Sequence, residues 1–327
     1  MRQRVLTALI DLPRAVPASE YGVTVQQVVR RLSGVSGVNS IYQVGHVSDP
    51  GISDLDLLVV FDSDARYRED PRCGLGPTGR YLLIHSLFGV TQRQVGEAAQ
   101  LTFLQNYQLR WGEPQPVACT GTLSADEERL LKCQLALEYM LRIYASLFVQ
   151  FTYRLLKVRS LLLHAKALHY DCDMLGMRSS PLRAAAARVA DRRRGWFAAA
   201  SPCCQIADDA AELCNCLGMT LADLLKEQPF FLAHDPPRRS SCGRHLVFRH
   251  GATFGISHRG LLLPPALGKF CRRYIGILDR LNHFDVVLPF SSALVPSVIQ
   301  RTFALRDHLA QANRTVCPHF MPLSLPL

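Results

Sequence analysis

The pattern of apolar and polar positions in the first part of the chain predicts a helix followed by two strands. In residues 18–32, valine and leucine recur at helical spacing, and the Ser- and Gly-rich residues 33–37 end this helix. Residues 40–45 form an extended segment that leads into a turn-rich stretch. Residues 52–61 begin with alternating charged and apolar positions and end in a continuous apolar run, which is typical of a strand buried on both faces.

The pattern becomes less regular after this strand. Residues 63–80 are polar and contain glycine and proline, so they are predicted to form a loop, with or without a short helix. Residues 81–88 are predicted to be another strand. Residues 101–111 are predicted to contain a short helix that leads into a strand ending near Glu113.

A change of composition at Ser124 marks the start of a largely helical part. Ser124 and Glu127 have the spacing of a capping box, in which each side chain satisfies a free backbone amide. No proline or glycine occurs from there to Tyr170, which predicts a long helix with one break near residues 151–153. The remaining pattern predicts helices at residues 181–194, 204–226, 266–282 and 295–311, and a small hairpin at residues 246–263.

The length of 327 residues and the order of these elements predict an α+β fold with about two domains. Residues 1–120 are expected to form an N-terminal α/β core with a small mixed sheet. Residues 121–327 are expected to form a mainly α-helical domain, which would bind the acceptor if the protein is a group-transfer enzyme.

Composition and charge narrow the class of protein. With 48% apolar and 20% charged residues, the chain has the composition of a globular protein rather than a disordered one. No apolar run reaches the ~20 residues of a membrane span, and the first residues lack the apolar core of a secretory signal, so a cytoplasmic location is expected. The net charge of +10 favours anionic partners, although the basic residues are dispersed along the chain.

The eleven cysteines are odd in number and form no C-x-x-C pair. Disulfide frameworks usually have even counts, and zinc sites usually have a two-residue spacer between thiolates. The cysteines are therefore interpreted as free thiols in a reducing compartment.

The strand at residues 52–61 carries the clearest candidate chemistry. Asp54 and Asp56 are two positions apart, so an extended backbone places both carboxylates on one face, with Cα atoms about 6.6 Å apart. Carboxylates at this spacing suit divalent cations that stabilise the oxygens of a transferred phosphoryl group. Mg²⁺, or Mn²⁺ in its place, is expected, because such ions combine a few carboxylates with nucleotide phosphates. The alternative is a strand start with carboxylates in solvent, although aspartate is disfavoured in strands.

The turn before this strand has features of a phosphate-binding loop. Gly45 closes the preceding strand, where the absence of a side chain lets the backbone approach a ligand. Ser48, Gly51 and the amides around them are able to hydrogen-bond phosphate oxygens.

The segment from Gly45 to Val60, and its Ser-Asp-Leu-Asp-Leu run at residues 53–57 above all, resembles the active-site signature of the polymerase-beta-type nucleotidyltransferase superfamily. The preceding helix and a following helical domain also match the order of elements in that family. The resemblance implies transfer of a nucleoside monophosphate from a nucleoside triphosphate to an acceptor, with release of pyrophosphate. The acceptor, which is a small molecule, a sugar, a protein or an RNA end, and the base of the nucleotide are left open.

The resemblance also assigns roles to individual residues. Asp54 and Asp56 would hold the metal ions. The residues at the nucleotide would be Gly45, His46, Ser48 and Ser53, with His46 standing where the family usually has serine or glycine. On the long helix, Lys157 either reaches the triphosphate or belongs to a solvated basic stripe.

The family's third metal-binding carboxylate has no clear counterpart in the chain. Glu113 is the nearest carboxylate at a predicted strand end, and its alternative interpretation is a loop residue. The segment around Ile84 offers His85 and Ser86 rather than an aspartate, and His85 is interpreted as a hydrogen-bonded, partly buried histidine.

Three functions therefore remain in view. The first is a metal-dependent nucleotidyltransferase, and the second is a nucleotide-binding or scaffold module that has lost catalysis. The third is a basic RNA-binding processing factor, which is motivated by the net charge.

Overall fold

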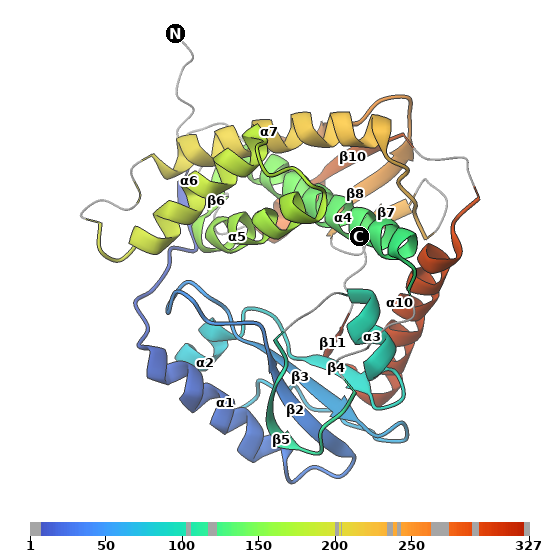
Figure 1. Ribbon diagram of the computed structural model, residues 1–327. Helices are drawn as coiled ribbons and strands as arrows, with labels where there is room; N and C mark the ends of the chain where they lie inside the picture. The colour runs from blue at the N-terminus through green and yellow to red at the C-terminus, as the bar shows by residue number, and fades with distance from the viewer. Residues whose placement is uncertain are drawn as a thin grey trace. The chain divides into compact units, whose positions relative to one another are not determined.

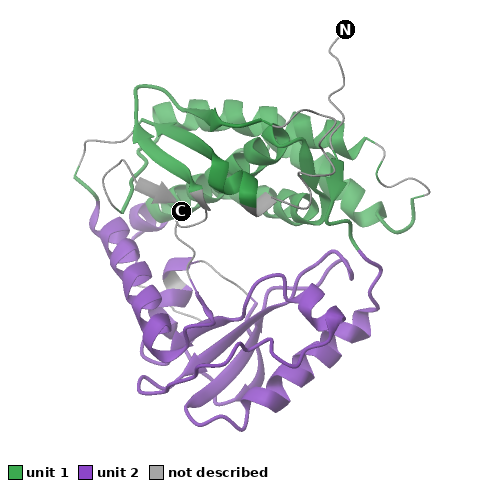
Figure 2. Cartoon of the chain, turned by 180° about the vertical axis from the view of Figure 1, so that it is seen from behind, with its two compact units in different colours: residues 1–13, 129–295, 327 green, residues 14–128, 296–326 purple. Residues whose placement is uncertain are grey.

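The computed structural model describes residues 8–102, 106–116, 123–199, 203, 205–233, 238–240, 243–262, 275–289 and 294–323. Its helices and small mixed sheets confirm the predicted α+β class (Figure 1). The chain forms two compact units, and each is built from separate stretches of sequence (Figure 2). Unit 1 consists of residues 1–13, 129–295 and 327, and unit 2 of residues 14–128 and 296–326.

Unit 2 is built on a five-stranded sheet with the order β11-β4-β3-β2-β5. Its strands are β2 (Val38–Val44), β3 (Asp56–Phe61), β4 (Phe88–Thr91), β5 (Gln108–Gly112) and β11 (Met321–Pro322). Its helices are α1 (Ala18–Leu32), α2 (Pro77–Leu82), α3 (Val95–Thr102) and α10 (Ser297–Val316). Strand β2 pairs antiparallel with β3 and β5, whereas β4 pairs parallel with β3 and β11.

The alternation of side chains along β3 determines which face of the sheet is buried against α1. Leu57, Val59 and Phe61 belong to a core cluster with the apolar face of α1, including Val25 and Val28. Because successive side chains of a strand point to opposite faces, the intervening positions, beginning with Asp56, point away from this cluster. The apolar side chains of β3 that pack against α1 and the Asp56 carboxylate therefore lie on opposite faces of the sheet.

The helix α10 shows how the units differ from the expected division at residue 120. The sequence correctly predicts a helix near residues 295–311, but this helix contacts α3, β4 and β11 and so belongs to unit 2. Phe320, which follows α10, lies in the same core cluster as Phe61, and their rings meet edge to face at 5.1 Å. The chain returns to unit 2 only at residue 296, and the pattern of apolar positions near residue 120 does not indicate this return.

Residues 81–87 form no strand, contrary to the prediction of a strand at residues 81–88. The helix α2 ends at Leu82, and β4 begins only at Phe88. Both elements contribute buried leucines, Leu82 and Leu87, to one core cluster. Together they produce an apolar run, and periodicity alone does not separate a helix end from a strand in so short a run.

Unit 1 combines helices with two sheets. Its helices are α4 (Ala125–Thr152, from residue 129), α5 (Val158–Met174), α6 (Pro181–Gly195), α7 (Ile206–Glu227) and α9 (Ile275–Leu281). Its strands are β1 (Ala8–Ile10), β6 (Leu155–Lys157), β7 (Arg238–Ser240), β8 (Gly243–His250), β9 (Gly255–Gly260) and β10 (Asn282–Leu288). The strands β1 and β6 form a parallel pair, and the others form a sheet in the order β7-β8-β10-β9.

The long predicted helix begins and breaks where the sequence indicates. The Ser124 amide donates to Glu127 Oε2 at 2.9 Å, and the Glu127 amide donates to Ser124 Oγ at 3.3 Å, which confirms the capping box. The helix is interrupted after Thr152, and Arg154 has a positive φ of 56°. The following residues then form β6 before α5 begins.

The predicted hairpin at residues 246–263 is wrong in its pairing. The strands β8 and β9 exist, but β10 lies between them, parallel to β8 and antiparallel to β9. The sequence analysis predicts no strand at the position of β10. The helix predicted at residues 266–282 ends at Asn282, which is the first residue of β10. Of that predicted helix, α9 is observed, and residues 266–274 lie outside the described residues.

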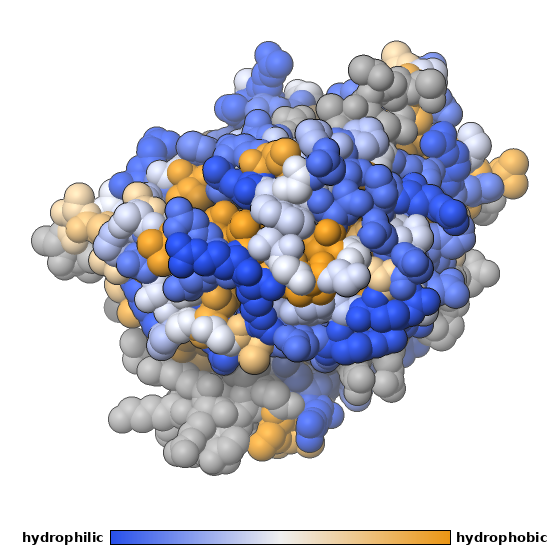
Figure 3. All heavy atoms as spheres, turned by 90° about the horizontal axis from the view of Figure 1, so that it is seen from below, coloured by the Kyte–Doolittle hydropathy of each residue, from blue (hydrophilic) through white to orange (hydrophobic). Residues whose placement is uncertain are grey.

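Among the described residues, no helix is both long enough and apolar enough to cross a bilayer. The face of the molecule in Figure 3 is mainly hydrophilic, with its hydrophobic side chains in small separate groups. Every cysteine within the described ranges is a free thiol.

A buried carboxyl group in α5 provides a test of the packing of unit 1. Asp171 is 5% exposed, and its Oδ2 has no hydrogen-bond partner among the described residues. Burial raises the pKa of Asp171 to about 8, so the group is protonated in the fold at neutral pH. The unfolded chain ionises it near its ordinary pKa of 3.8, and the free energy of unfolding therefore falls as the pH rises from about 4 to about 8.

We predict that Asp171→Asn raises the free energy of unfolding at pH 7 by a few kcal/mol and flattens its decline between pH 4 and pH 8, because the amide has no proton to lose. Thermal or urea unfolding over this pH range measures the effect. The control is Asp173→Asn on the same helix, whose half-exposed carboxylate lies 3.3 Å from Arg183 Nε and should change stability by less than about 1 kcal/mol. An unchanged pH slope in Asp171→Asn would contradict the burial of an ionisable group.

Candidate metal centre

The register of β2 and β3 places the start of β3 beside the end of β2. Val44 pairs with Asp56, so the turn between the strands begins and ends at the same edge of the sheet. Gly45 follows directly with a φ of 76°, a backbone conformation that favours glycine. The predicted order of strand, glycine turn and acidic strand is therefore present at the level of the backbone.

Two tyrosines hold the turn from outside its own sequence. The Tyr21 hydroxyl of α1 accepts from the Gly51 amide at 3.0 Å and donates to the Ser53 carbonyl at 2.7 Å. The Tyr81 hydroxyl of α2 donates to the Gly51 carbonyl at 2.5 Å. Since these hydrogen bonds fix three peptide groups of the turn, the backbone that leads into Asp54 is held between α1 and α2.

The turn also carries internal hydrogen bonds. The amides of Ile52 and Ser53 donate to the Asp49 carbonyl, and the Asp49 amide donates to Ser53 Oγ at 3.1 Å. The Ser53 side chain is buried, with 3% exposure. Its hydroxyl therefore stabilises the turn, and it is not displayed to a nucleotide as the resemblance implied.

Asp54, Asp56 and His85 form the candidate centre. One ligand atom from each residue lies within 4.8 Å of the ligand atoms of the other two, and all three side chains are half-buried. Asp54 lies two residues before β3 and Asp56 begins it, whereas His85 lies between α2 and β4, the parallel neighbour of β3. The three residues meet because the start of β4 lies beside the start of β3.

The imidazole of His85 is oriented by two contacts. Its Nδ1 lies 2.7 Å from the Ser86 carbonyl, which only accepts, so Nδ1 carries a proton. Its Nε2 lies 3.0 Å from Asp56 Oδ1. Burial by itself lowers the pKa of His85, but the contacts with Asp56 and Ser86 and the charge of Asp54 outweigh it and raise the pKa.

The chemistry of the three side chains fits a divalent cation. Asp56 Oδ1 is buried, and although His85 Nε2 is near, no hydrogen bond of good geometry from the described residues reaches this oxygen. When His85 is neutral, its Nε2 bears a lone pair on the side of the carboxylates, as a metal ligand does. Asp54, Asp56 and His85 are thus able to hold a metal ion, with carboxylates that suit Mg²⁺ or Mn²⁺ and an imidazole that suits transition metals.

His85 corrects the interpretation of the third position. The histidine is hydrogen-bonded and partly buried, as predicted, but it also completes the cluster with the two aspartates. In the sequence, the one indication of this role is that His85 lies in the segment around Ile84, which offers a histidine rather than an aspartate. No periodicity could show that β4 begins beside Asp56.

Glu113 lies at the other end of the sheet, so the prediction of a third carboxylate there is wrong. Its amide donates to the Asn39 carbonyl, whereas Asp56 pairs with Val44. Five residues of extended β2 separate those positions, which is roughly 16 Å. The antiparallel pairing of β2 and β5 carries the end of β5 away from the aspartates.

The remaining predicted residues are divided between the two units. His46 and Ser48 are exposed in the turn after Gly45, and Ser48 Oγ donates to Asp49 Oδ2 at 2.7 Å. Lys157 ends β6 in unit 1, so it is not on a continuous helical stripe. Its exposed side chain lines a cavity of that unit.

Comparisons with known proteins assign no function to the chain, so a proposed function rests on the geometry described above. No family model, no curated protein and no solved structure matches the chain.

We predict that Tyr21→Phe lowers the free energy of unfolding by about 1–3 kcal/mol, because it leaves the buried Gly51 amide without its partner. It should also weaken Mn²⁺ binding, since the backbone before Asp54 is no longer held. Unfolding experiments and Mn²⁺ titration calorimetry measure the two effects. Tyr170→Phe removes an exposed hydroxyl and serves as the control, with little change in either quantity. Wild-type stability and affinity in Tyr21→Phe would refute this role for the hydroxyl.

Proposed function

We propose that the protein is a metal-dependent nucleotidyltransferase that transfers a nucleoside monophosphate from a nucleoside triphosphate to an acceptor. The observation that carries the proposal is the convergence of Asp54, Asp56 and His85 directly after the turn that begins at Gly45. Two carboxylates and an imidazole supply a metal site beside a glycine-containing turn, in which His46 and Ser48 are exposed. This combination suits a polyphosphate substrate.

Each group has a distinct part in the proposed reaction. Asp54 and Asp56 bind the cation, Mg²⁺ or Mn²⁺, and His85 adds a nitrogen ligand or orients Asp56. When bound, the cation supplies Lewis-acid stabilisation of the phosphate oxygens. The exposed turn at His46 and Ser48 faces the solvent from which the triphosphate is taken.

The proposed reaction replaces one phosphorus–oxygen bond by another. An acceptor oxygen forms a bond to the α-phosphorus, the bond between the α-phosphorus and the bridging oxygen breaks, and pyrophosphate leaves. The proton of an acceptor hydroxyl passes to the surrounding solvent or to a nearby base. The carboxylates provide the preorganised negative charge that keeps the cation at the reacting phosphate.

The pairing of His85 with Asp56 favours a second candidate function. A histidine stands at the cluster where the resemblance implies a third carboxylate, and that carboxylate would be the group best placed to activate an acceptor. A module that binds nucleotides without turning them over has no need of such a group. Binding and turnover therefore have to be measured separately.

We predict that the wild-type protein releases pyrophosphate and transfers label from α-labelled nucleoside triphosphates when Mg²⁺ or Mn²⁺ is present. The double variant Asp54→Asn/Asp56→Asn should lose at least about 10³-fold of this rate, because the cation contributes several kcal/mol of transition-state stabilisation. Asp64→Asn, which changes an exposed aspartate of the same unit, should retain the wild-type rate.

Equal transfer by the wild type and the double variant would eliminate the enzymatic proposal. Metal-dependent binding of a triphosphate without any turnover would instead favour the nucleotide-binding module. Calorimetry with the same triphosphates distinguishes that result from a complete loss of binding.

A further inference from the structure

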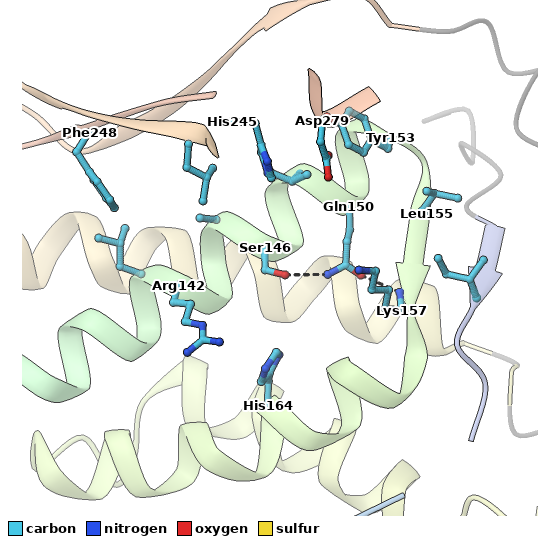
Figure 4. Close-up of a pocket in the computed structure, with 15 residues that line it drawn as sticks. Arg142, Ser146, Gln150, Tyr153, Leu155, Lys157, His164, His245, Phe248 and Asp279 are labelled. Carbon is cyan, nitrogen blue, oxygen red and sulfur yellow. Dashed lines mark hydrogen bonds between the residues drawn. The ribbon is translucent and has the colours of Figure 1, made fainter. Parts of the chain in front are cut away.

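A cavity of about 350 Å³ lies within unit 1, apart from the residues of the candidate metal centre (Figure 4). We call it the α4 cavity, because α4 supplies much of its wall. The rest comes from α5, α9, β1, β6 and β8. Its volume is in the range of small-molecule sites and is too small for a macromolecule.

One wall of the α4 cavity is a polar stripe on an otherwise largely apolar helix. Arg142, Ser146 and Gln150 are spaced four residues apart, so they lie one above another on the same face of α4. Gln150 Nε2 donates to Ser146 Oγ at 3.0 Å, and the Lys157 amide donates to Gln150 Oε1 at 2.7 Å. Ser146 Oγ accepts the bond from Gln150 (Figure 4), so its own hydroxyl proton remains able to donate to a ligand in the cavity that Ser146 lines.

The lining of the cavity carries positive charge that is not neutralised by an ion pair within the described ranges. Within the described ranges, neither the Arg142 guanidinium nor the Lys157 ammonium forms an ion pair, and both side chains line the cavity. His164 rises from α5 toward Arg142 (Figure 4). Burial, with the nearby Arg142 charge, lowers the pKa of His164 to about 4, so at neutral pH the ring adds a hydrogen-bonding group without charge.

Other side chains that line the cavity are apolar. Leu246 and Phe248 of β8 are buried there, and Leu141 and Val149 of α4 face the same space. The carboxylate of the cavity, Asp279, lies with His245 and Tyr153 away from Arg142 (Figure 4). The lining of the α4 cavity thus combines two cationic side chains and several hydrogen-bond donors with apolar and aromatic side chains, and it also includes the carboxylate of Asp279.

We propose that the α4 cavity binds a small phosphate monoester with an apolar or aromatic body, its phosphate bound at the polar stripe between Arg142 and Lys157 and its body packed against Leu246 and Phe248. A guanidinium, an ammonium, a hydroxyl and an amide offer more hydrogen-bond donors than the two oxygens of a carboxylate accept. The three terminal oxygens of a phosphate match this number better, and arginine binds phosphate bidentately. This site is separate from the proposed nucleotidyl transfer and does not depend on it.

The test uses phenyl phosphate as the probe, with the full-length protein in EDTA so that no divalent cation takes part. Titration calorimetry should show saturable binding that is at least tenfold tighter than that of inorganic phosphate or phenol alone. Lys157→Gln changes an exposed side chain and leaves the fold intact, and it should weaken binding at least tenfold. Arg142→Gln should have a similar effect.

Two controls separate the site from general electrostatic attraction and from the metal centre. Arg129→Gln removes an exposed arginine of the same helix that does not line the cavity, and it should change the affinity less than twofold. Asp54→Asn/Asp56→Asn should bind phenyl phosphate as the wild type does. In NMR spectra, the probe should shift the imidazole signals of His164, which a distant surface site would leave unchanged.

Absence of saturable binding would overturn the proposal. So would equal weakening by Arg129→Gln and Lys157→Gln, or binding of inorganic phosphate as tight as that of phenyl phosphate. Loss of the probe site in Asp54→Asn/Asp56→Asn would show that the phosphate binds at the metal centre instead.

Discussion

The hydroxyl of Tyr21 joins an amide and a carbonyl of the turn that leads into Asp54, and the rest of the candidate centre depends on this contact. A turn of this length between two strands has many conformations available, and fixing it costs conformational entropy. The hydrogen bonds from Tyr21 and Tyr81 come from two helices that are themselves packed in the core of unit 2. The position of the first carboxylate is therefore set by the hydrophobic core behind the sheet.

The sheet itself supplies the second constraint. The period of β3 sends Leu57 and Val59 into the core and leaves Asp56 on the other face. The parallel pairing of β3 and β4 then brings His85 to the same end. Partial burial of two carboxylates and an imidazole so close together costs free energy unless a cation or a proton offsets the negative charge of the carboxylates. The protein thus places unfavourable electrostatics at one point on an otherwise well-packed strand, as functional sites commonly do.

Local signals in the sequence were sufficient for some of these features. The glycine at residue 45 and the capping box at Ser124 each express a rule that acts over a few residues, and the structure contains both. The strand predicted at residues 52–61 is present only from Asp56, because the residues before it belong to the turn. Features that depend on distant pairing were not readable. His85 joins the aspartates only because β4 lies beside β3, and Glu113 is excluded only by the register of β5 on β2.

The same limit explains the errors in the helical part. The strand β10 lies between β8 and β9, and α10 belongs to unit 2. No local sequence pattern indicates either arrangement. The polar stripe from Arg142 to Gln150 was hidden for a different reason. Its spacing is visible in the sequence, but only the positions of α5 and β8 show that the stripe lines a cavity rather than solvent.

The most direct test of the account is a crystal structure of the full-length protein grown with Mn²⁺ and a nonhydrolysable nucleoside triphosphate, with anomalous scattering used to locate the metal. The account predicts a Mn²⁺ peak in direct coordination with the carboxylates of Asp54 and Asp56, with His85 as a ligand or a neighbour of the ligands. A metal bound elsewhere, or no metal at this end of β3 at saturating Mn²⁺, would contradict it.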